Sequence, residues 1–142
     1  MKNTYLFLLF SLFLFSCSAD DSANRFSEKE LFGKWFLSGG SINGGAFQPY
    51  IHNCETNRDF QEFLSNKELT LNKFNEACIL NNPEVSNWEL IGTKLIISNT
   101  NFDPINYNYT YEIIKLTDTE LIIEMSSKSP DEMYVERIFL EK

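Results

Sequence analysis

Hydrophobic and polar side chains alternate along most of the chain from Lys34 onward. Apolar residues recur at every second position, as in strands with one buried and one solvent-facing side. The alternation predicts eight strands, over residues 34–38, 60–64, 68–74, 85–90, 94–98, 107–113, 120–125 and 133–141. No long helical pattern interrupts them, and most connections are short. The expected class is therefore all-β, with antiparallel strands that follow one another as a meander.

Two segments depart from this alternation. Ser27 and Glu30 have the spacing of a capping box, which predicts one or two helical turns that reach Phe32 before Gly33 ends them. The stretch 39–45 contains two pairs of glycines. Because glycine weakens strands, we expect this stretch to be an irregular, flexible loop.

Eight antiparallel strands can form two stacked sheets or close on themselves. Closure removes the exposed edges that would otherwise promote aggregation. An eight-stranded barrel has an interior that side chains just fill, or that holds one small ligand. The alternation alone leaves both architectures open.

The first sixteen residues differ from the rest of the chain. Lys2 precedes an apolar run over residues 5–15 that ends at Ser16. A helix that spans a membrane needs about 20 residues, whereas this shorter run has the length of a signal peptide. We interpret residues 1–16 as an export signal that is removed.

The end of this run resembles a bacterial lipobox. Leu14, Phe15 and Ser16 precede Cys17, and in that motif the cysteine becomes the lipidated first residue of the mature protein. Residues 18–21 then resemble the acidic export signal of Bacteroidetes lipoproteins. The resemblance implies a bacterial outer-membrane lipoprotein, held by acyl chains such as palmitate on Cys17 through a flexible tether over residues 17–26. Which face of the membrane it occupies is left open.

Charge excludes one class of partner. The chain has 12 basic and 20 acidic residues and a net charge of −8, and its lysines and arginines are scattered singly. Such a surface repels phosphate backbones, so no nucleic-acid partner is expected. Its 43% hydrophobic and 23% charged residues are typical of a folded domain.

Two cysteines remain once Cys17 is acylated. Outside the cytoplasm Cys54 and Cys78 are expected to form a disulfide, which would stabilise the fold by roughly 3.5 kcal/mol. A metal site that uses His52 is the alternative. Because zinc needs three or four protein ligands and no further histidine is present, we expect no metal and no other cofactor.

Residues 31–35 carry a second resemblance. Gly33 and Trp35 form a Gly-x-Trp motif at the start of the first strand, similar to the opening motif of lipocalins. The cysteines, the Trp88-x-Leu90 strand and the turn into residues 95–97 then follow in the order typical of Bacteroidetes lipocalin-like lipoproteins. The resemblance covers roughly residues 28–142. It implies an eight-stranded up-and-down barrel over residues 27–142, with a short helical turn at its N-terminal end and no assigned ligand.

An arginine late in the chain packs on the first-strand tryptophan of many lipocalins. The resemblance therefore suggests a cation–π pair between Arg137 and Trp35. The alternative is an Arg137 that faces solvent.

Aromatic residues on the predicted strands favour a small-molecule site. The tyrosines at 107, 109 and 111 are in phase on one face, and tryptophans lie on two other strands. Together they could line a cavity for a small apolar or amphipathic molecule. The ligand-binding candidates are Trp35, Trp88, Tyr107, Tyr109 and Tyr111. The alternative is that these side chains fill the barrel completely.

A protein-interaction or hydrolase-inhibitor module is the second functional hypothesis. Phe47, Tyr50 and Ile51 would be exposed on a glycine-hinged loop over residues 39–54, held at its base by the disulfide. The same loop could instead fold over the barrel mouth as a lid.

Enzyme activity is not expected. His52 is the single histidine, and no nucleophile elbow or phosphate loop is present. Glu112, Glu120 and Glu124 alternate with apolar residues, which favours a solvated barrel exterior for these carboxylates.

Overall fold

A computed structural model describes residues 26–98, 108–128 and 133–142. The signal peptide, the lipobox with Cys17 and almost all of the tether lie outside the described residues, and so does Tyr107. None of the helices within the described ranges has the length and hydrophobicity needed to cross a bilayer.

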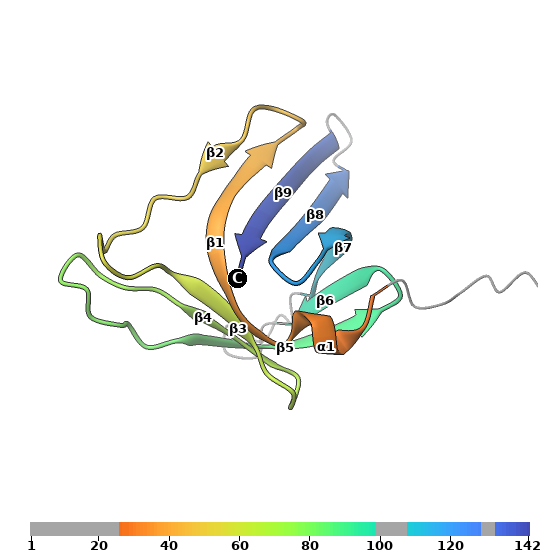
Figure 1. Ribbon diagram of the computed structural model, residues 1–142. Helices are drawn as coiled ribbons and strands as arrows, with labels where there is room; N and C mark the ends of the chain where they lie inside the picture. The colour runs from red at the N-terminus through yellow and green to blue at the C-terminus, as the bar shows by residue number, and fades with distance from the viewer. Residues whose placement is uncertain (1–25, 99–107, 129–132) are drawn as a thin grey trace, which may run out of the picture.

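The described residues form one short helix, α1 (Glu28–Leu31), and nine strands. The strands are β1 (Gly33–Ile42), β2 (Gln48–Pro49), β3 (Phe60–Phe63), β4 (Glu68–Asn72), β5 (Glu84–Ile91), β6 (Lys94–Ser98), β7 (Asn108–Leu116), β8 (Glu120–Lys128) and β9 (Met133–Glu141). Each pairs antiparallel with its neighbour, in the order β1, β3, β4 and onward to β9, and β9 pairs back with β1. These eight strands close a barrel, and β2 adds a two-residue strand along β1 (Figure 1). The predicted all-β, eight-stranded barrel is confirmed.

The capping box at the start of α1 is also confirmed. The Ser27 hydroxyl accepts a hydrogen bond from the Lys29 amide at 3.3 Å, and the Glu30 carboxylate accepts one from the Ser27 amide at 2.6 Å. These bonds satisfy amides that a helix start leaves unpaired. The helix ends at Leu31, and Gly33 turns the chain into β1 with a φ of 102°.

The core fills the end of the barrel that α1 covers. Alternate residues of each strand point inward, so the apolar residues that recur at every second position form the buried side of the closed sheet. The fully or almost fully buried side chains at this end are Leu31, Trp35, Phe63, Leu69, Trp88, Leu95, Ile113, Leu121, Ile123 and Leu140. We call this part of the interior the filled half.

The predicted glycine-rich loop is wrong at its beginning. β1 continues through Gly39 and Gly40 to Ile42, because Gly40 pairs with Ile138 of β9 on one side and Gln48 of β2 on the other. A Cβ atom on Gly39 would lie 2.5 Å from the Phe47 ring. Glycine here therefore permits close approach of Phe47, and the reversal of the chain comes only afterwards, at Asn43 and Gly44.

Strands β7 and β8 each continue three residues beyond their predicted ends, to Leu116 and Lys128. A bulge between Ile113 and Lys115 shifts the register of β7 against β8 and leaves Ile114 40% exposed. The extra residue breaks the period of two, so the pattern predicted an end to the strand where the structure has a bulge.

The disulfide between Cys54 and Cys78 is confirmed, with Cα atoms 4.9 Å apart. It ties the segment between β2 and β3 to the segment between β4 and β5. Among the described residues no group of three His, Cys, Asp or Glu side chains is placed to hold a metal ion.

Of the two alternatives for Arg137, the structure confirms the solvent-facing one, and the stacking on Trp35 is wrong. Arg137 points outward from β9 and binds Glu124 with its Nε at 2.5 Å. The ammonium of Lys142 instead lies 4.2 Å from the Trp35 ring centroid. The strand's alternation explains this, because Arg137 is an odd number of residues from the inward-facing Leu140.

The barrel exterior carries the glutamates that the sequence placed there. Glu112 accepts a hydrogen bond from the Thr93 hydroxyl, Glu120 binds Lys115 at 2.6 Å, and Glu124 binds Arg137. These carboxylates therefore have partners on the outer surface.

Candidate functional site

The interior beyond the filled half is only partly buried. Inward-facing side chains there contact the core but keep some exposure: Tyr50, Leu71, Ile97, Tyr111 and Ile138. Tyr109, the next inward residue of β7, is 42% exposed. We call this region the open half. Side chains fill one end of the barrel and leave accessible wall at the other.

The four predicted ligand-binding residues that the structure describes do not lie together. Trp35 and Trp88 are in the filled half, and their indole N–H groups are already bonded. Trp35 Nε1 donates to the Leu31 carbonyl at 2.6 Å, and Trp88 Nε1 donates to the Glu68 carbonyl at 3.1 Å. Both tryptophans therefore form the floor of the interior, and their polar groups are not available to a ligand.

Tyr109 and Tyr111 lie in the open half, opposite Ile97 and Leu95 of β6 in the register. Burial, followed by the charge of Glu136 and then by Tyr109, raises the pKa of Tyr111 above its usual value of 10.0. Because Tyr111 packs against the core and Tyr109 is two residues away on the same strand, both tyrosines lie on the inner side of β7. Tyr107 lies outside the described residues.

A hollow of about 490 Å³ opens on the inner side of β1, β2 and β9. It is lined by Leu37, Gly39, Gly40, Gln48, Pro49, Tyr50, Ile51, Glu136 and Ile138. An adjoining hollow of about 380 Å³ shares Gly40, Gln48 and Glu136 with it. We refer to the larger one as the β1–β2–β9 hollow. Most of its wall is apolar, and Gln48 and Glu136 supply the polar side chains.

Sequence reasoning missed Glu136. Leu140 and Ile138 of β9 are inward-facing, and Glu136 continues the same alternation. The register confirms this position, because Glu136 lies opposite Ile42 of β1 and Met125 of β8. A carboxylate in phase with the apolar side of a strand was the signal that could have identified it.

The segment proposed as an interaction loop lies along the barrel. Phe47 packs edge-on against Phe139 of β9, with ring centroids 5.2 Å apart. Phe47, at 47%, and Ile51, at 86%, are exposed as expected, whereas Tyr50 is half-buried. Strand β2 holds this segment, because Gln48 and Pro49 pair with β1.

A buried carboxylate fixes Tyr50 in place. Asp59 is 1% exposed and accepts hydrogen bonds from the Tyr50 hydroxyl at 2.9 Å and the Phe74 amide at 2.8 Å. The Asp59 amide in turn donates to His52 Nδ1 at 3.0 Å, and the Tyr50 and His52 rings pack edge-to-face. Because its ring nitrogen already accepts a bond, His52 has a structural role in this loop.

Tyr50 is expected to titrate late and to make the fold sensitive to alkali. Burial, the hydrogen bond to Asp59 and the Asp59 charge raise the pKa of Tyr50 from 10.0 to about 12. The folded state holds the phenol proton more tightly than the unfolded state, so this stabilisation is complete below pH 10.0 and is lost as pH approaches 12. The check is a phenolate absorbance titration of the wild type and Tyr50→Phe, whose difference should rise only near pH 12. A difference already complete at pH 10 would contradict the assignment.

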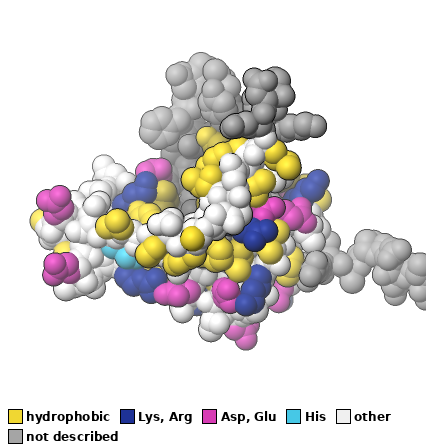
Figure 2. All heavy atoms as spheres, turned by 90° about the horizontal axis from the view of Figure 1, so that it is seen from above, with side chains coloured by type: hydrophobic (Ala, Val, Ile, Leu, Met, Phe, Trp, Pro, Cys, Tyr) yellow, Lys and Arg dark blue, Asp and Glu magenta, His cyan; other side chains and the backbone are white. Residues whose placement is uncertain are grey.

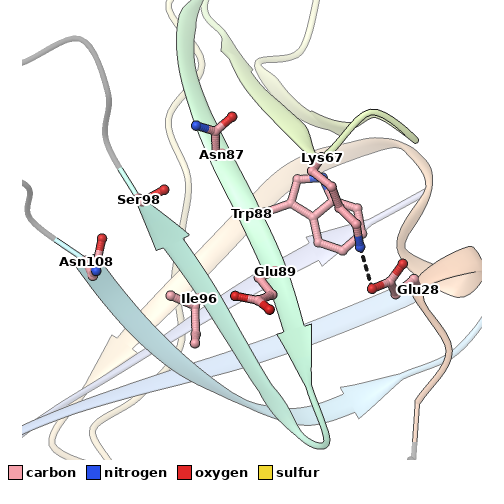
Figure 3. Close-up of a pocket in the computed structure, with 8 residues that line it drawn as sticks. All are labelled: Glu28, Lys67, Asn87, Trp88, Glu89, Ile96, Ser98 and Asn108. Carbon is pink, nitrogen blue, oxygen red and sulfur yellow. Dashed lines mark ion pairs between the residues drawn. The ribbon is translucent and has the colours of Figure 1, made fainter.

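A third hollow of about 390 Å³ lies outside the barrel, near α1 (Figure 3). Its charged groups are already partnered, since Lys67 binds Glu28 and its ammonium lies 4.5 Å from the Trp88 ring centroid. Among the described residues that line this hollow, Glu89 is the one charged residue that forms no ion pair.

Hydrophobic side chains gather on the face of the barrel seen in Figure 2, with Lys, Arg, Asp and Glu side chains around them. The described chain includes Ile42, Phe47 and Ile51 among its exposed large hydrophobic residues, and all three lie on or next to β1 and β2. Apolar surface thus continues from the β1–β2–β9 hollow to the outside.

Two solved structures are similar to this chain. A lipocalin-like protein from Bacteroides uniformis superimposes with a TM-score of 0.56 and 15% identity, covering 80% of this chain and 98% of that one. The bovine lipocalin allergen Bos d 2 has a TM-score of 0.47 and 13% identity, covering 82% of this chain and 75% of that one. At such low identity the first similarity shows the fold alone.

No curated protein sequence matches the chain. Residues 31–123, by contrast, match the family described as the lipocalin-like domain. The matched segment begins at Leu31 in α1 and extends to Ile123 in β8, so it includes the Gly-x-Trp motif, both cysteines of the disulfide and most of the barrel strands. The chain therefore belongs to the lipocalin-like domain family.

Proposed function

We propose that the barrel binds a small apolar or amphipathic molecule in the β1–β2–β9 hollow. The observation that carries this proposal is the contrast between the two halves of the interior. Side chains fill the end near α1, whereas inward-facing residues beyond Leu37 stay partly exposed around a hollow of about 490 Å³. Ligand pockets typically measure roughly 300–1,000 Å³.

The chemistry of the wall supports an amphipathic ligand. Leu37, Pro49 and Ile138 provide apolar surface, and the Tyr50 ring is held beside them by its bond to Asp59. Gln48 and Glu136 can orient a polar end. A mostly apolar pocket with few polar groups is the usual form of a small-molecule site.

Export and membrane attachment through Cys17 complete the proposal. An acylated Cys17 followed by a short tether would hold the barrel beside the bilayer, where apolar molecules partition. The binding role of a lipocalin-like barrel suits that location. A protein-interaction role has less support, because Phe47 and Tyr50 pack on the barrel.

The proposal is tested by filling the hollow. Gln48 is exposed on β2, so Gln48→Trp adds an indole at the hollow without removing core contacts. We expect a saturable fluorescence increase when the wild type is titrated with an apolar naphthylamine probe, and at least a roughly ten-fold weaker affinity in Gln48→Trp, since one lost apolar contact group is worth about 1–3 kcal/mol.

Thr110→Trp is the matched control. Thr110 is exposed on β7 and lies opposite Ile96 on the outer side of the barrel. This variant gains the same side chain away from the hollow and should keep the affinity of the wild type. Equal affinities in Gln48→Trp and Thr110→Trp, or no saturable signal in the wild type, would overturn the proposal.

A further inference from the structure

The inner wall of the barrel carries a carboxylate without a basic partner. Glu136 points inward between Ile42 and Met125, two apolar side chains, and lines both connected hollows. The next residue, Arg137, points outward and binds Glu124. Of the ion pairs among the described residues, none involves Glu136.

Glu136 is partly buried in this apolar wall, so it is less hydrated than a fully exposed carboxylate. A charged group that loses water without gaining a partner is destabilised, and a bound cation offsets that loss. The barrel exterior differs, since Glu124 and Glu120 there each have a basic partner. The unpaired position of Glu136 is therefore suited to a positive charge that comes from outside the chain.

Tyrosines lie near this carboxylate on the inner wall. Glu136 lies opposite Met125 of β8, and β7, which carries Tyr111 and Tyr109 on its inner side, pairs with the other edge of β8. The charge of Glu136 also contributes to the raised pKa of Tyr111. Aromatic faces attract ammonium groups through their electron density, and this attraction is stronger where water is excluded. A carboxylate with adjacent tyrosines combines the two features that bind organic cations.

A second inward-facing group also accepts hydrogen bonds. Gln61 Oε1 is buried and has no donor within the described part of the chain. Gln61 lies opposite Trp35 and Leu71, whose side chains point into the barrel. Gln61 does not line the β1–β2–β9 hollow, so Glu136 is the group there that an ammonium donor can satisfy and a carboxylate ligand cannot.

We propose that the ligand of the β1–β2–β9 hollow is an organic ammonium ion with an apolar body, whose positive group binds Glu136 beside Tyr111 and Tyr109. This inference rests on the proposed function and narrows it. Fatty acids and other anionic amphiphiles are disfavoured, because their carboxylate would face that of Glu136. The net charge of −8 also favours the approach of cations.

The test compares three probes with one chain length: decylammonium, decanol and decanoate, each below its micelle concentration and at neutral pH. Binding is followed by intrinsic fluorescence of the purified protein and by calorimetry. We expect the wild type to bind decylammonium roughly ten-fold more tightly than decanol, as a charge-assisted hydrogen bond predicts, and decanoate most weakly. In Glu136→Gln this preference for decylammonium over decanol should disappear while decanol affinity stays unchanged.

Glu89→Gln is the matched control. Glu89 is exposed on β5 and faces outward opposite Ile96, so this variant loses the same charge away from the inner wall. It should keep the full preference for decylammonium. An equal loss of preference in both variants would show a general charge effect and overturn the inference.

The two proposals fail in different ways. Saturable binding of decanol without any preference for decylammonium would overturn the cationic ligand and leave the apolar site intact. Absence of saturable binding by all three probes would overturn the proposed function itself, and the inference with it.

Discussion

Replacing Trp35 by alanine is expected to lower the free energy of unfolding by about 3–5 kcal/mol, the usual cost of removing a large aromatic ring from a core. Trp35 has no exposed surface and lies at the centre of the filled half. Its indole N–H donates to the Leu31 carbonyl at 2.6 Å, which ties α1 to β1. The ammonium of Lys142 covers the ring from outside, 4.2 Å from its centroid. One substitution thus removes core volume, a helix contact and a cation–π pair.

The measurement is a urea unfolding curve followed by the fluorescence of Trp88, which remains in the variant. Trp35→Phe is the matched control, because it keeps an aromatic ring and loses the N–H donor. Trp35→Phe should lower the free energy of unfolding less than Trp35→Ala does, because it loses the hydrogen bond without leaving a large cavity. A loss below about 1 kcal/mol in Trp35→Ala would mean that the filled half does not depend on this ring.

Alternation in the sequence was sufficient to predict the eight barrel strands but not the two-residue β2, because in a barrel each strand has one inward and one outward side. The alternation failed at positions where hydrogen bonds from neighbouring strands decide whether a residue belongs to a strand. Gly39 and Gly40 have low strand propensity, yet they are in β1, because β9 and β2 bond to them from both sides. The bulge at Ile114 could not be predicted either, since one extra residue interrupts the alternation in the same way as the end of a strand.

The candidate site was only partly predictable for a related reason. The alternation placed Tyr109 and Tyr111 on one side of a strand, which the register confirms, but it contains no measure of depth along the barrel axis. Trp35 and Trp88 share that inward direction and lie at the closed end, because β1 and β5 place them beside α1 and Phe63. Depth follows from the stagger between strands, which only the assembled barrel reveals.

Glu136 shows the opposite case, a residue that the sequence could have identified. It is in phase with Ile138 and Leu140, whereas Arg137 is out of phase. The same parity argument would have excluded the stacking of Arg137 on Trp35. A charged residue on the apolar side of a strand was therefore the clearest indication of a site in this chain, since such a residue loses part of its hydration on folding.

Removing the disulfide, by replacing both Cys54 and Cys78 with alanine, is expected to lower the free energy of unfolding by roughly 3.5 kcal/mol, since the bond closes a loop between residues 24 apart. The loss of stability should be greatest for the loops at the open half of the barrel. The bond joins the two segments that meet at Asp59, which accepts a hydrogen bond from the Tyr50 hydroxyl on one segment and from the Phe74 amide on the other.

The check is urea unfolding of the oxidised wild type, the reduced wild type and the double variant. The reduced wild type and the double variant should share one midpoint, below that of the oxidised wild type. The single variant Cys78→Ala, which leaves Cys54 buried as a free thiol, separates loss of the bond from loss of the buried sulfur. An oxidised and a reduced protein with the same midpoint would show that the loops are held by Asp59 alone.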